Sequence, residues 1–515
     1  METAFDDYTI DKYKQDIDLY GIKEVWDQIL QYRDKHNDVV DILRSENFGE
    51  LYEIGLAHAN KESKKEFGKY YTPDDVATLL AEYLKDLIGS PVCDVCCGVG
   101  NLILKYLEVL GPEDAKKLLL SNQVYLYDID PIAISICKFK IKEVYGNEVV
   151  DHIQCMCGDF LSSKIQLPAG CKVISNPPYF HMQECNVLWE VSDTIMNGRD
   201  MYAAFMEKII TTSNSSVMIT PFSFTYGDKF YSLRKKLNKL NGIIHSFDNV
   251  PGNIFNGKKH GIFNTNTSNS VRVSVTIVEN IPDTCGFKIG PLIRFQSSER
   301  EFIINRKNLE KLLPEERQIV TDDDSKYHKV FKSLLDIYHT WVQAADGRFN
   351  SLLSATKTEY KLSVPNTSRY YVSGTKLDLA RDGKNVLYFK NYDTMCYAYC
   401  VLNSSFAYWW WRMFGGGTSY HIGLLKTIPI KFKTATAHDM ELIRGAVEFI
   451  SPKESEYVTY KLNAQKMQEN VKFPKEFRDR FNEILLLNFG CPINPHVFDC
   501  VHANNITECM KEGDS

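Results

Sequence analysis

The sequence predicts an α/β fold: a doubly wound, Rossmann-like sheet, preceded by an N-terminal helical segment and followed by a C-terminal mixed α+β domain. Two observations predict this fold. Between residues 91 and 247, short apolar runs of strand length alternate with longer amphipathic runs, as they do in a largely parallel sheet. Four of the apolar runs end in loops with glycine, acidic or amide residues, and ligands bind beyond the carboxyl ends of such strands.

The elements follow in chain order. Residues 1–60 place apolar side chains at helical spacing. Thr72 and Pro73 then predict a sharp helix start, with Thr72 as the N-cap and Pro73 as the first helical residue. The expected strands and helices of the sheet are residues 92–96, 101–110, 124–128, 131–144, 153–156, 173–175, 201–211, 217–220, 230–240 and 243–247.

The sheet pattern ends near Asn280. Just before it, residues 271–277 alternate apolar and polar side chains, which predicts a half-exposed strand near the sheet edge. Residues 281–440 are rich in aromatic side chains and irregular in pattern, so they form a second domain. Residues 441–487 return to helical spacing and lead into a tail rich in glycine, proline and asparagine.

Bulk properties limit the class of protein. A chain of 515 residues with 44% hydrophobic and 24% charged residues is typical of a folded protein of several domains. The N-terminus is acidic and no apolar run reaches the ~20 residues of a membrane span, so we expect a cytoplasmic protein without a signal peptide. The 14 cysteines include no pair of well-spaced Cys-x-x-Cys units completed by histidines, so we expect no metal.

Charge is distributed unevenly along the chain. The formal net charge is −6, but residues 1–60 hold 6 Lys+Arg against 14 Asp+Glu, whereas residues 281–440 hold 22 against 16. A basic C-terminal half suits a polyanionic partner such as nucleic acid. Ordinary solvation of a protein surface accounts for this excess equally well.

The first two loops indicate a cofactor that contains a nucleoside. After the first strand, Asp94 is followed by Gly98 and Gly100, which let a ligand approach the backbone before a helix N-terminus. After the second strand, Asp128 and Ile129 place an acid where it can accept both hydroxyls of a ribose. Gly100 has no further glycine three residues later, which favours S-adenosylmethionine over a dinucleotide.

The third loop suits an adenine ring, and the fourth loop suits an NH2 group. In the third loop, Asp159 can accept a hydrogen bond from an adenine amine, and Phe160 offers an aromatic face. In the fourth loop, two prolines hold the backbone so that the side-chain oxygen of the residue before them and a carbonyl can accept both hydrogens of an NH2 group. The aromatic ring after the prolines can stack on the ring that bears the amine. This catalytic loop is Asn176, Pro177, Pro178 and Tyr179.

The order of these loops resembles the adenine-N6-specific DNA methyltransferases of restriction-modification systems, over residues 67–280. The resemblance implies a catalytic S-adenosylmethionine-dependent methyltransferase domain at 61–280, a target (DNA) recognition domain at 281–440, and helical segments at 1–60 and 441–515. The cofactor-binding residues that it implies are Tyr71, Thr72, Asp94, Gly98, Gly100, Asp128, Ile129, Asp159 and Phe160.

The resemblance also implies a mechanism and partners. Adenine N6, flipped out of double-stranded DNA, receives the methyl group directly, without a metal, and any restriction endonuclease is a separate chain. Tyr179 stacks on the target base, and Phe255 is expected to form a second aromatic wall, although a core role suits Phe255 equally. The sequence departs from the family at Val95, Cys96 and Val99, where a reshaped cofactor pocket is expected.

Other interpretations of the same residues stay open. RNA adenine and protein glutamine methyltransferases carry the same tetrapeptide, and a non-catalytic DNA-recognition subunit of a restriction complex could keep the fold alone. The long basic C-terminal domain favours DNA. Within that domain, Ser404, Ser405 and the tryptophans at 409–411 resemble the family's specificity domain, but three adjacent tryptophans suit a core at least as well.

Overall fold

The computed structural model describes residues 72–182, 192–255, 271–367, 371–415, 419–463 and 466–507. The predicted helical segment at 1–60 and Tyr71 lie outside these ranges. The chain divides into two compact units, residues 1–289 with 293–326, and residues 327–515 with 290–292. This division lies further along the chain than the predicted boundary at 280, because one more strand joins the sheet after that residue.

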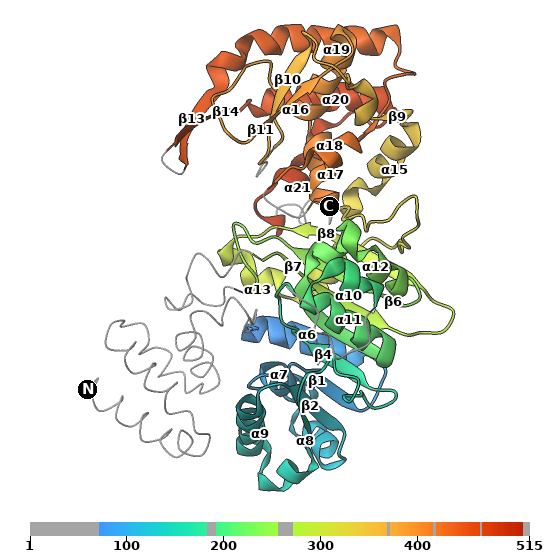
Figure 1. Ribbon diagram of the computed structural model, residues 1–515, viewed down its shortest axis with the longest axis vertical. Helices are drawn as coiled ribbons and strands as arrows, with labels where there is room; N and C mark the ends of the chain where they lie inside the picture. The colour runs from blue at the N-terminus through green and yellow to red at the C-terminus, as the bar shows by residue number, and fades with distance from the viewer. Residues whose placement is uncertain are drawn as a thin grey trace, which may run out of the picture. The chain divides into compact units, whose positions relative to one another are not determined.

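The first unit is built on an eight-stranded sheet of order β3-β2-β1-β4-β5-β7-β6-β8 (Figure 1). The strands β3 to β5 pair in parallel, and β7 runs antiparallel between β5 and β6. The predicted doubly wound α/β sheet is therefore confirmed. The strands are β1 (Val92–Val95), β2 (Val124–Asp128), β3 (Gln154–Cys157), β4 (Lys172–Ser175), β5 (Ser215–Pro221), β6 (Asn241–Phe247), β7 (Val273–Glu279) and β8 (Gly286–Ile293).

Helices flank this sheet (Figure 1). The first of them packs on α7 and against β4 and β5, and it buries the apolar face that its spacing predicts, including Leu80 and Leu84. None of the described helices is long and apolar enough to cross a membrane. The helices of the first unit are α6 (Asp74–Asp86), α7 (Asn101–Leu110), α8 (Pro112–Leu120), α9 (Pro131–Tyr145), α10 (Asp193–Gly198), α11 (Met201–Thr212), α12 (Tyr231–Leu237), α13 (Arg300–Ile303) and α14 (Arg306–Lys311).

Two local predictions in this unit are wrong. Helix α6 begins at Asp74 with Pro73 as its N-cap, so Thr72 does not cap it. Strand β7 is an interior strand, and its polar residues Ser274 and Thr276 are fully buried. The alternation that indicated exposure instead reflects small hydroxyl groups, which can satisfy one another inside a sheet: Ser274 Oγ lies 3.5 Å from the hydroxyl oxygen of Thr220 on β5.

The second unit mixes helices with short sheets, as predicted for the C-terminal domain. Its principal elements are α15 (Leu335–Ala344), β10 (Lys361–Pro365), β11 (Lys384–Tyr388), α16 (Tyr392–Asn403), α17 (Ser405–Phe414), α19 (Ala437–Ile450), β13 (Val458–Asn463), β14 (Lys466–Val471) and α20 (Lys475–Phe489). The segment predicted as helical beyond residue 440 thus contains an antiparallel hairpin, β13–β14. Its alternation at Tyr460 and Leu462, both exposed, is a strand signal within a longer helical pattern.

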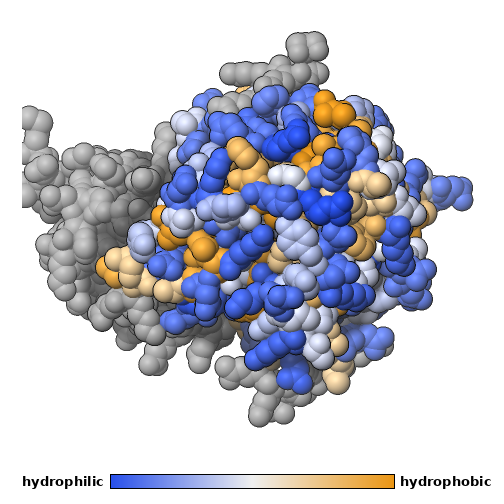
Figure 2. Space-filling view, turned by 90° about the horizontal axis from the view of Figure 1, so that it is seen from above, coloured by the Kyte–Doolittle hydropathy of each residue, from blue (hydrophilic) through white to orange (hydrophobic). Residues whose placement is uncertain are grey.

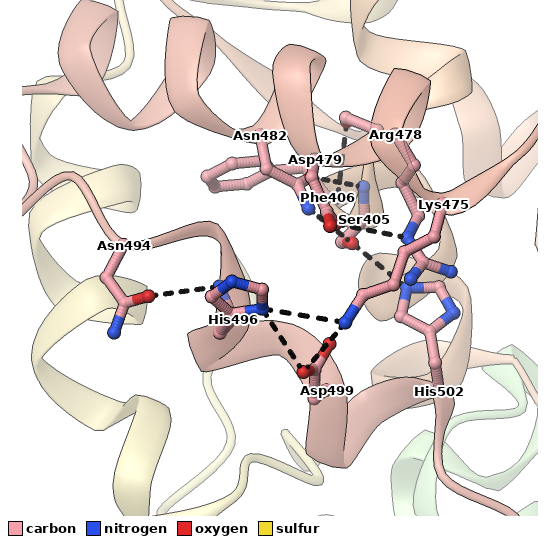
Figure 3. Close-up of polar contacts among 11 residues, drawn as sticks. Ser405, Phe406, Lys475, Arg478, Asp479, Asn482, Asn494, His496, Asp499 and His502 are labelled. Carbon is pink, nitrogen blue, oxygen red and sulfur yellow. Dashed lines mark hydrogen bonds and ion pairs between the residues drawn. The ribbon is translucent and has the colours of Figure 1, made fainter.

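The adjacent tryptophans of α17 belong to the core of this unit. Trp409, Trp410 and Trp411 are at most 6% exposed, and Trp409 stacks on Trp341 with ring centroids 5.6 Å apart. The neighbouring serine is also structural (Figure 3): Ser405 exchanges two hydrogen bonds with Asn482, and its Oγ lies 2.9 Å from Nε2 of His502. A core role for these residues therefore replaces any role in reading bases. On the face shown in Figure 2, the outer side chains are mainly hydrophilic.

Candidate functional site

Four loops of the first unit meet at one edge of the sheet. Strands β1, β2, β3 and β4 are parallel and in register, so that Val95 lies opposite Tyr127 on one side and Ser175 on the other. Their carboxyl ends therefore share an edge, and the strand order reverses between β1 and β4. Open α/β sheets bind ligands at this position.

The glycine loop after β1 packs closely against α9. Gly98 and Gly100 have φ angles of 50° and 89°, where a side chain would be strained. A Cβ atom on Gly100 would lie 2.4 Å from Sγ of Cys137. The loop thus needs glycine both for its backbone conformation and for its packing.

Asp94 lies behind this loop and is fully buried. Its Oδ2 accepts a hydrogen bond from the backbone N–H of Ile103 at 3.1 Å, in the first turn of α7. Its Oδ1 has no hydrogen-bond partner within the part of the chain that the structure describes. Burial raises the pKa of Asp94 to about 8. A buried polar atom of this kind fits a hydrogen bond with a bound ligand.

Asp128 connects the first and second loops. Its Oδ2 accepts from the backbone N–H of Gly98 at 2.8 Å, and its Oδ1 from that of Asp130 at 2.9 Å. A carboxylate has about four lone-pair positions, so both oxygens can still accept from a ribose. Next to it, Ile129 is 65% exposed and can cover a ligand. Asp130 has a different task, because its side chain caps α9.

In the third loop, Asp159 is exposed and Phe160 is buried. Asp159 Oδ1 accepts from the backbone N–H of Leu161 at 3.0 Å, which orders the turn. The ring of Phe160 stacks on that of Phe205, with ring centroids 5.2 Å apart. The Nζ atom of Lys208 lies 4.7 Å from the centroid of the Phe160 ring. Phe160 therefore has substantial contacts within the core, in addition to any contact with a ligand.

In the fourth loop, the Asn176 side chain is oriented by Thr72, two residues before α6. Its Nδ2 donates to Oγ1 of Thr72 at 2.9 Å, and the carbonyl oxygen of Thr72 accepts from Nδ2 of Asn101 at 2.5 Å. These bonds set the plane of the Asn176 amide and so the direction of its oxygen. The structure thus brings the predicted Thr72 and Asn176 together. Asn101 is a third member that the sequence analysis missed, although its place at the start of a helix after the glycines is a signal.

The two predicted stacking residues are neighbours. The rings of Tyr179 and Phe255 have centroids 6.1 Å apart at an angle of 56°, and Tyr202 contacts Tyr179 from another side at 6.4 Å. The Tyr179 hydroxyl donates to the carbonyl oxygen of Ile219 at 2.8 Å, which holds its ring in place. Residues far apart in sequence therefore form one aromatic corner beside the Asn176 loop.

Comparisons with known proteins find similarity over the part of the chain that holds these loops. Residues 43–269 match the family model for the N-6 DNA methylases, and every predicted site residue lies within the match. The type II methyltransferase M.VspI from Vibrio sp. (strain 343) is 28% identical over 224 residues, which are 43% of this chain and 49% of that protein. The methylase subunit of the type I restriction enzyme MpnII from Mycoplasma pneumoniae is 29% identical over 144 residues, 26% of this chain and 25% of that subunit.

The matched part thus spans about half of the first relative and a quarter of the second. Among solved structures, a modification subunit of a putative type I restriction enzyme from Vibrio vulnificus YJ016 has 14% identity and a TM-score of 0.36, covering 59% of this chain and 60% of that one. Residues 43–269 of this chain are thus similar to the N-6 DNA methylases.

Proposed function

We propose that this chain transfers a methyl group from S-adenosylmethionine to the exocyclic N6 amine of adenine in double-stranded DNA, in a restriction-modification system. The observation that carries the proposal is the Asn176 loop at the switch point of the sheet, with its amide held by Thr72 and an aromatic corner beside it. Its position next to the glycine loop, on the neighbouring strand, supports a methyl donor within reach.

The residues present fit this cofactor. Gly98 and Gly100 leave two positions of the first loop without side chains, Asp128 offers carboxylate oxygens for ribose hydroxyls, and buried Asp94 offers a further hydrogen-bonding group. When bound, S-adenosylmethionine supplies a methyl group on a positively charged sulfonium. The task of the loops is to hold it in one orientation, since proximity and alignment account for much of such an acceleration.

The chemistry asked of the fourth loop is recognition of an NH2 group. We assign the side-chain oxygen of Asn176 and the carbonyl oxygen of Pro177 as acceptors for the two N6 hydrogens, which directs the nitrogen lone pair at the methyl group. The nitrogen would gain the methyl group that the bound cofactor supplies and would release one proton to bulk solvent. Exclusion of water by the aromatic corner favours this step.

The target base must leave the duplex to reach this loop, because N6 is paired inside DNA. Tyr179 and Phe255 are placed to replace part of the lost stacking. The basic excess of residues 281–440 supports contacts with DNA phosphates, and we assign these residues as the target recognition domain. A cognate endonuclease would be a separate chain.

The test is incubation of the protein with labelled S-adenosylmethionine and three acceptors: duplex DNA, RNA and peptide. We expect label in DNA, recovered as N6-methyladenine after digestion. DNA prepared from a strain without adenine methylation serves as substrate, so that target sites are not already modified. Label found only in RNA or in peptide would contradict the proposal.

A further inference from the structure

Arg300 joins two segments that border the candidate site. It is the first residue of α13, and its guanidinium makes four hydrogen bonds. Two go to the carboxylate of Asp75, from Nε at 2.5 Å and from Nη2 at 2.9 Å. The others go to the carbonyl oxygens of Asn253, from Nη1 at 2.9 Å, and of Ile254, from Nη2 at 2.7 Å. Its side chain is only 14% exposed.

The first anchor, Asp75, is close to the residue that holds the catalytic amide. It stands in the first turn of α6, three positions after Thr72, whose hydroxyl accepts from Asn176. Arg300 therefore fixes the beginning of α6 and, through it, the segment that orients Asn176.

The second anchor lies directly before the aromatic wall. The carbonyls of Asn253 and Ile254 precede Phe255, and the Asn253 side chain accepts from the backbone N–H of Phe255 at 2.9 Å. Asn253 is only 4% exposed, and Gly252 donates its N–H to the carbonyl of Phe295 at 2.8 Å. The backbone that carries Phe255 is thus held at several points, of which Arg300 provides two.

Only a guanidinium suits this set of acceptors. Its donors form a rigid planar fork that can meet a carboxylate with two bonds while other N–H groups meet carbonyls, whereas a lysine ammonium is a compact point with three donors. Arg300 itself is well anchored, because the preceding turn has a capping box made by Gln296 and Glu299, and Ile303 is buried.

We propose that Arg300 is a positioning residue for the target base: it sets the separation between Phe255 and the Asn176–Tyr179 loop, and hence the slot into which the base fits. The proposal rests on the proposed function, because it uses Phe255 and Tyr179 as the walls of that slot. Arg300 acts through the two segments that it joins, and it has no contact of its own with the reacting atoms.

The chain offers a matched control in Arg306. This arginine of α14 also binds α6, but at its opposite end: it pairs with Asp86 and donates to the carbonyl oxygen of Glu82 at 3.0 Å. A purely structural role in holding α6 is therefore common to both arginines. Contact with the Phe255 segment belongs to Arg300.

The experiment compares Arg300→Lys and Arg306→Lys in the full chain with the wild type. Three quantities are measured: the Kd of S-adenosylmethionine by calorimetry, the single-turnover rate of methyl transfer at saturating DNA, and base flipping. For flipping, the modified adenine is first located by sequencing DNA methylated by the wild type. 2-Aminopurine then replaces it in a short duplex, where its fluorescence rises when it is unstacked.

For Arg300→Lys we expect the transfer rate to fall by about 10- to 100-fold, because small misplacements of reacting groups have effects of this size. Its 2-aminopurine signal should fall with the rate, while the cofactor Kd changes by less than about threefold. Arg306→Lys should stay within about threefold of the wild type in all three. Asp75→Asn, which keeps the shape of the anchor but removes its negative charge, should reproduce the defect of Arg300→Lys in milder form.

The proposal is overturned if Arg300→Lys matches the wild type in rate and fluorescence, or if both arginine variants lose activity and cofactor affinity together. A wild type that binds the cofactor but labels no DNA would instead contradict the proposed function, and the assignment of Arg300 would fall with it.

Discussion

Asp94 and Asn176 are the two site residues whose chemistry is most directly testable at the scale of one side chain. Asp94 lies in β1 and Asn176 directly follows β4, two neighbouring strands at the centre of the sheet, and each side chain has a hydrogen bond with a neighbouring segment. They differ in what burial does to them, since one can ionise and the other cannot.

The pH dependence of stability should report on Asp94. Burial raises the pKa of its carboxyl from 3.8 to about 8, so the folded protein keeps a proton that the unfolded chain releases. Its contribution to stability is therefore complete below about pH 4 and is lost as the pH rises through about 8. In Asp94→Asn this dependence disappears. We expect the Tm of the variant, relative to the wild type, to increase between about pH 6 and pH 9 in calorimetric scans. Parallel curves would show that the group does not titrate there.

Asn176→Ala should lower the rate of methyl transfer by about 100-fold or more, because it removes the oxygen that we propose as an acceptor for the N6 amine. Cofactor binding, measured by calorimetry, should change little. Asn214→Ala is the matched control, since this asparagine also donates one hydrogen bond, to the carbonyl of Ile88, but precedes β5 at the opposite edge of the sheet. Loss of cofactor binding in Asn176→Ala would mean that the loop has been wrongly assigned.

At the scale of the elements, the packing of the glycine loop on α9 has a measurable consequence. Gly100→Ala should destabilise the protein by about 1–3 kcal/mol from its left-handed backbone, and further from the clash with Cys137. Gly490 is the matched control, because its left-handed backbone (φ 78°, ψ 24°) is close to that of Gly100 (φ 89°, ψ 21°) and there is open space around its Cα. Chemical denaturation should therefore show Gly100→Ala to be less stable than Gly490→Ala. Combining Gly100→Ala with Cys137→Ala should recover part of the difference.

The contact between β6 and α6 should make the first unit sensitive to acid. His245 lies in the sheet with Nε2 2.9 Å from the Tyr83 hydroxyl, and burial lowers the pKa of His245 to about 3. The unfolded chain takes up this proton below about pH 6.5, so stability falls as the pH drops from there toward 3. The slope from one such group is at most about 1.4 kcal/mol per pH unit.

A variant without this imidazole should lose that part of the slope. We expect the difference in unfolding free energy between the wild type and His245→Gln to shrink between about pH 7 and pH 5, measured by urea denaturation. His421→Gln, at an exposed position, controls for the loss of an imidazole that is not buried. An acid slope in His245→Gln equal to that of the wild type would place the sensitivity elsewhere.

At the scale of the whole molecule, the two units should respond differently to the cofactor. The candidate cofactor loops all belong to the first unit, whereas Trp341, Trp409, Trp410 and Trp411 are buried in the second. At a cofactor concentration of about 100 times Kd, the first unit should gain about 2.7 kcal/mol. The measurement uses a variant with Trp26→Phe and Trp189→Phe, in which only the tryptophans of the second unit remain. Adding the cofactor should shift the unfolding transition that circular dichroism follows, but not the transition that tryptophan fluorescence follows. Equal shifts in both signals would indicate one cooperative molecule.

The local elements of this protein were determined by its sequence, because they depend on short windows of chain. The apolar run at Val124–Asp128 coincides with the observed strand, and the helix Asn101–Leu110 has its predicted limits. The loops at Asp94, Asp128 and Asn176 carry their own signals in glycine, acid and proline, and the parallel sheet then brings them to one edge. The fold class and the Asn176 loop could thus be predicted without a structure.

Contacts between distant residues were decided only by the tertiary structure. Whether Val273–Glu279 lies at the edge or inside depends on β6 and β5 pairing on either side of it, which alternation alone cannot show. The distance of 6.1 Å between the ring centroids of Tyr179 and Phe255 likewise cannot be read from the pattern of either segment alone. Arg300 is the extreme case, since it stands 225 residues from Asp75. The order of strands in the sheet, which no short window contains, is what places that guanidinium between Asp75 and the carbonyl oxygens of Asn253 and Ile254.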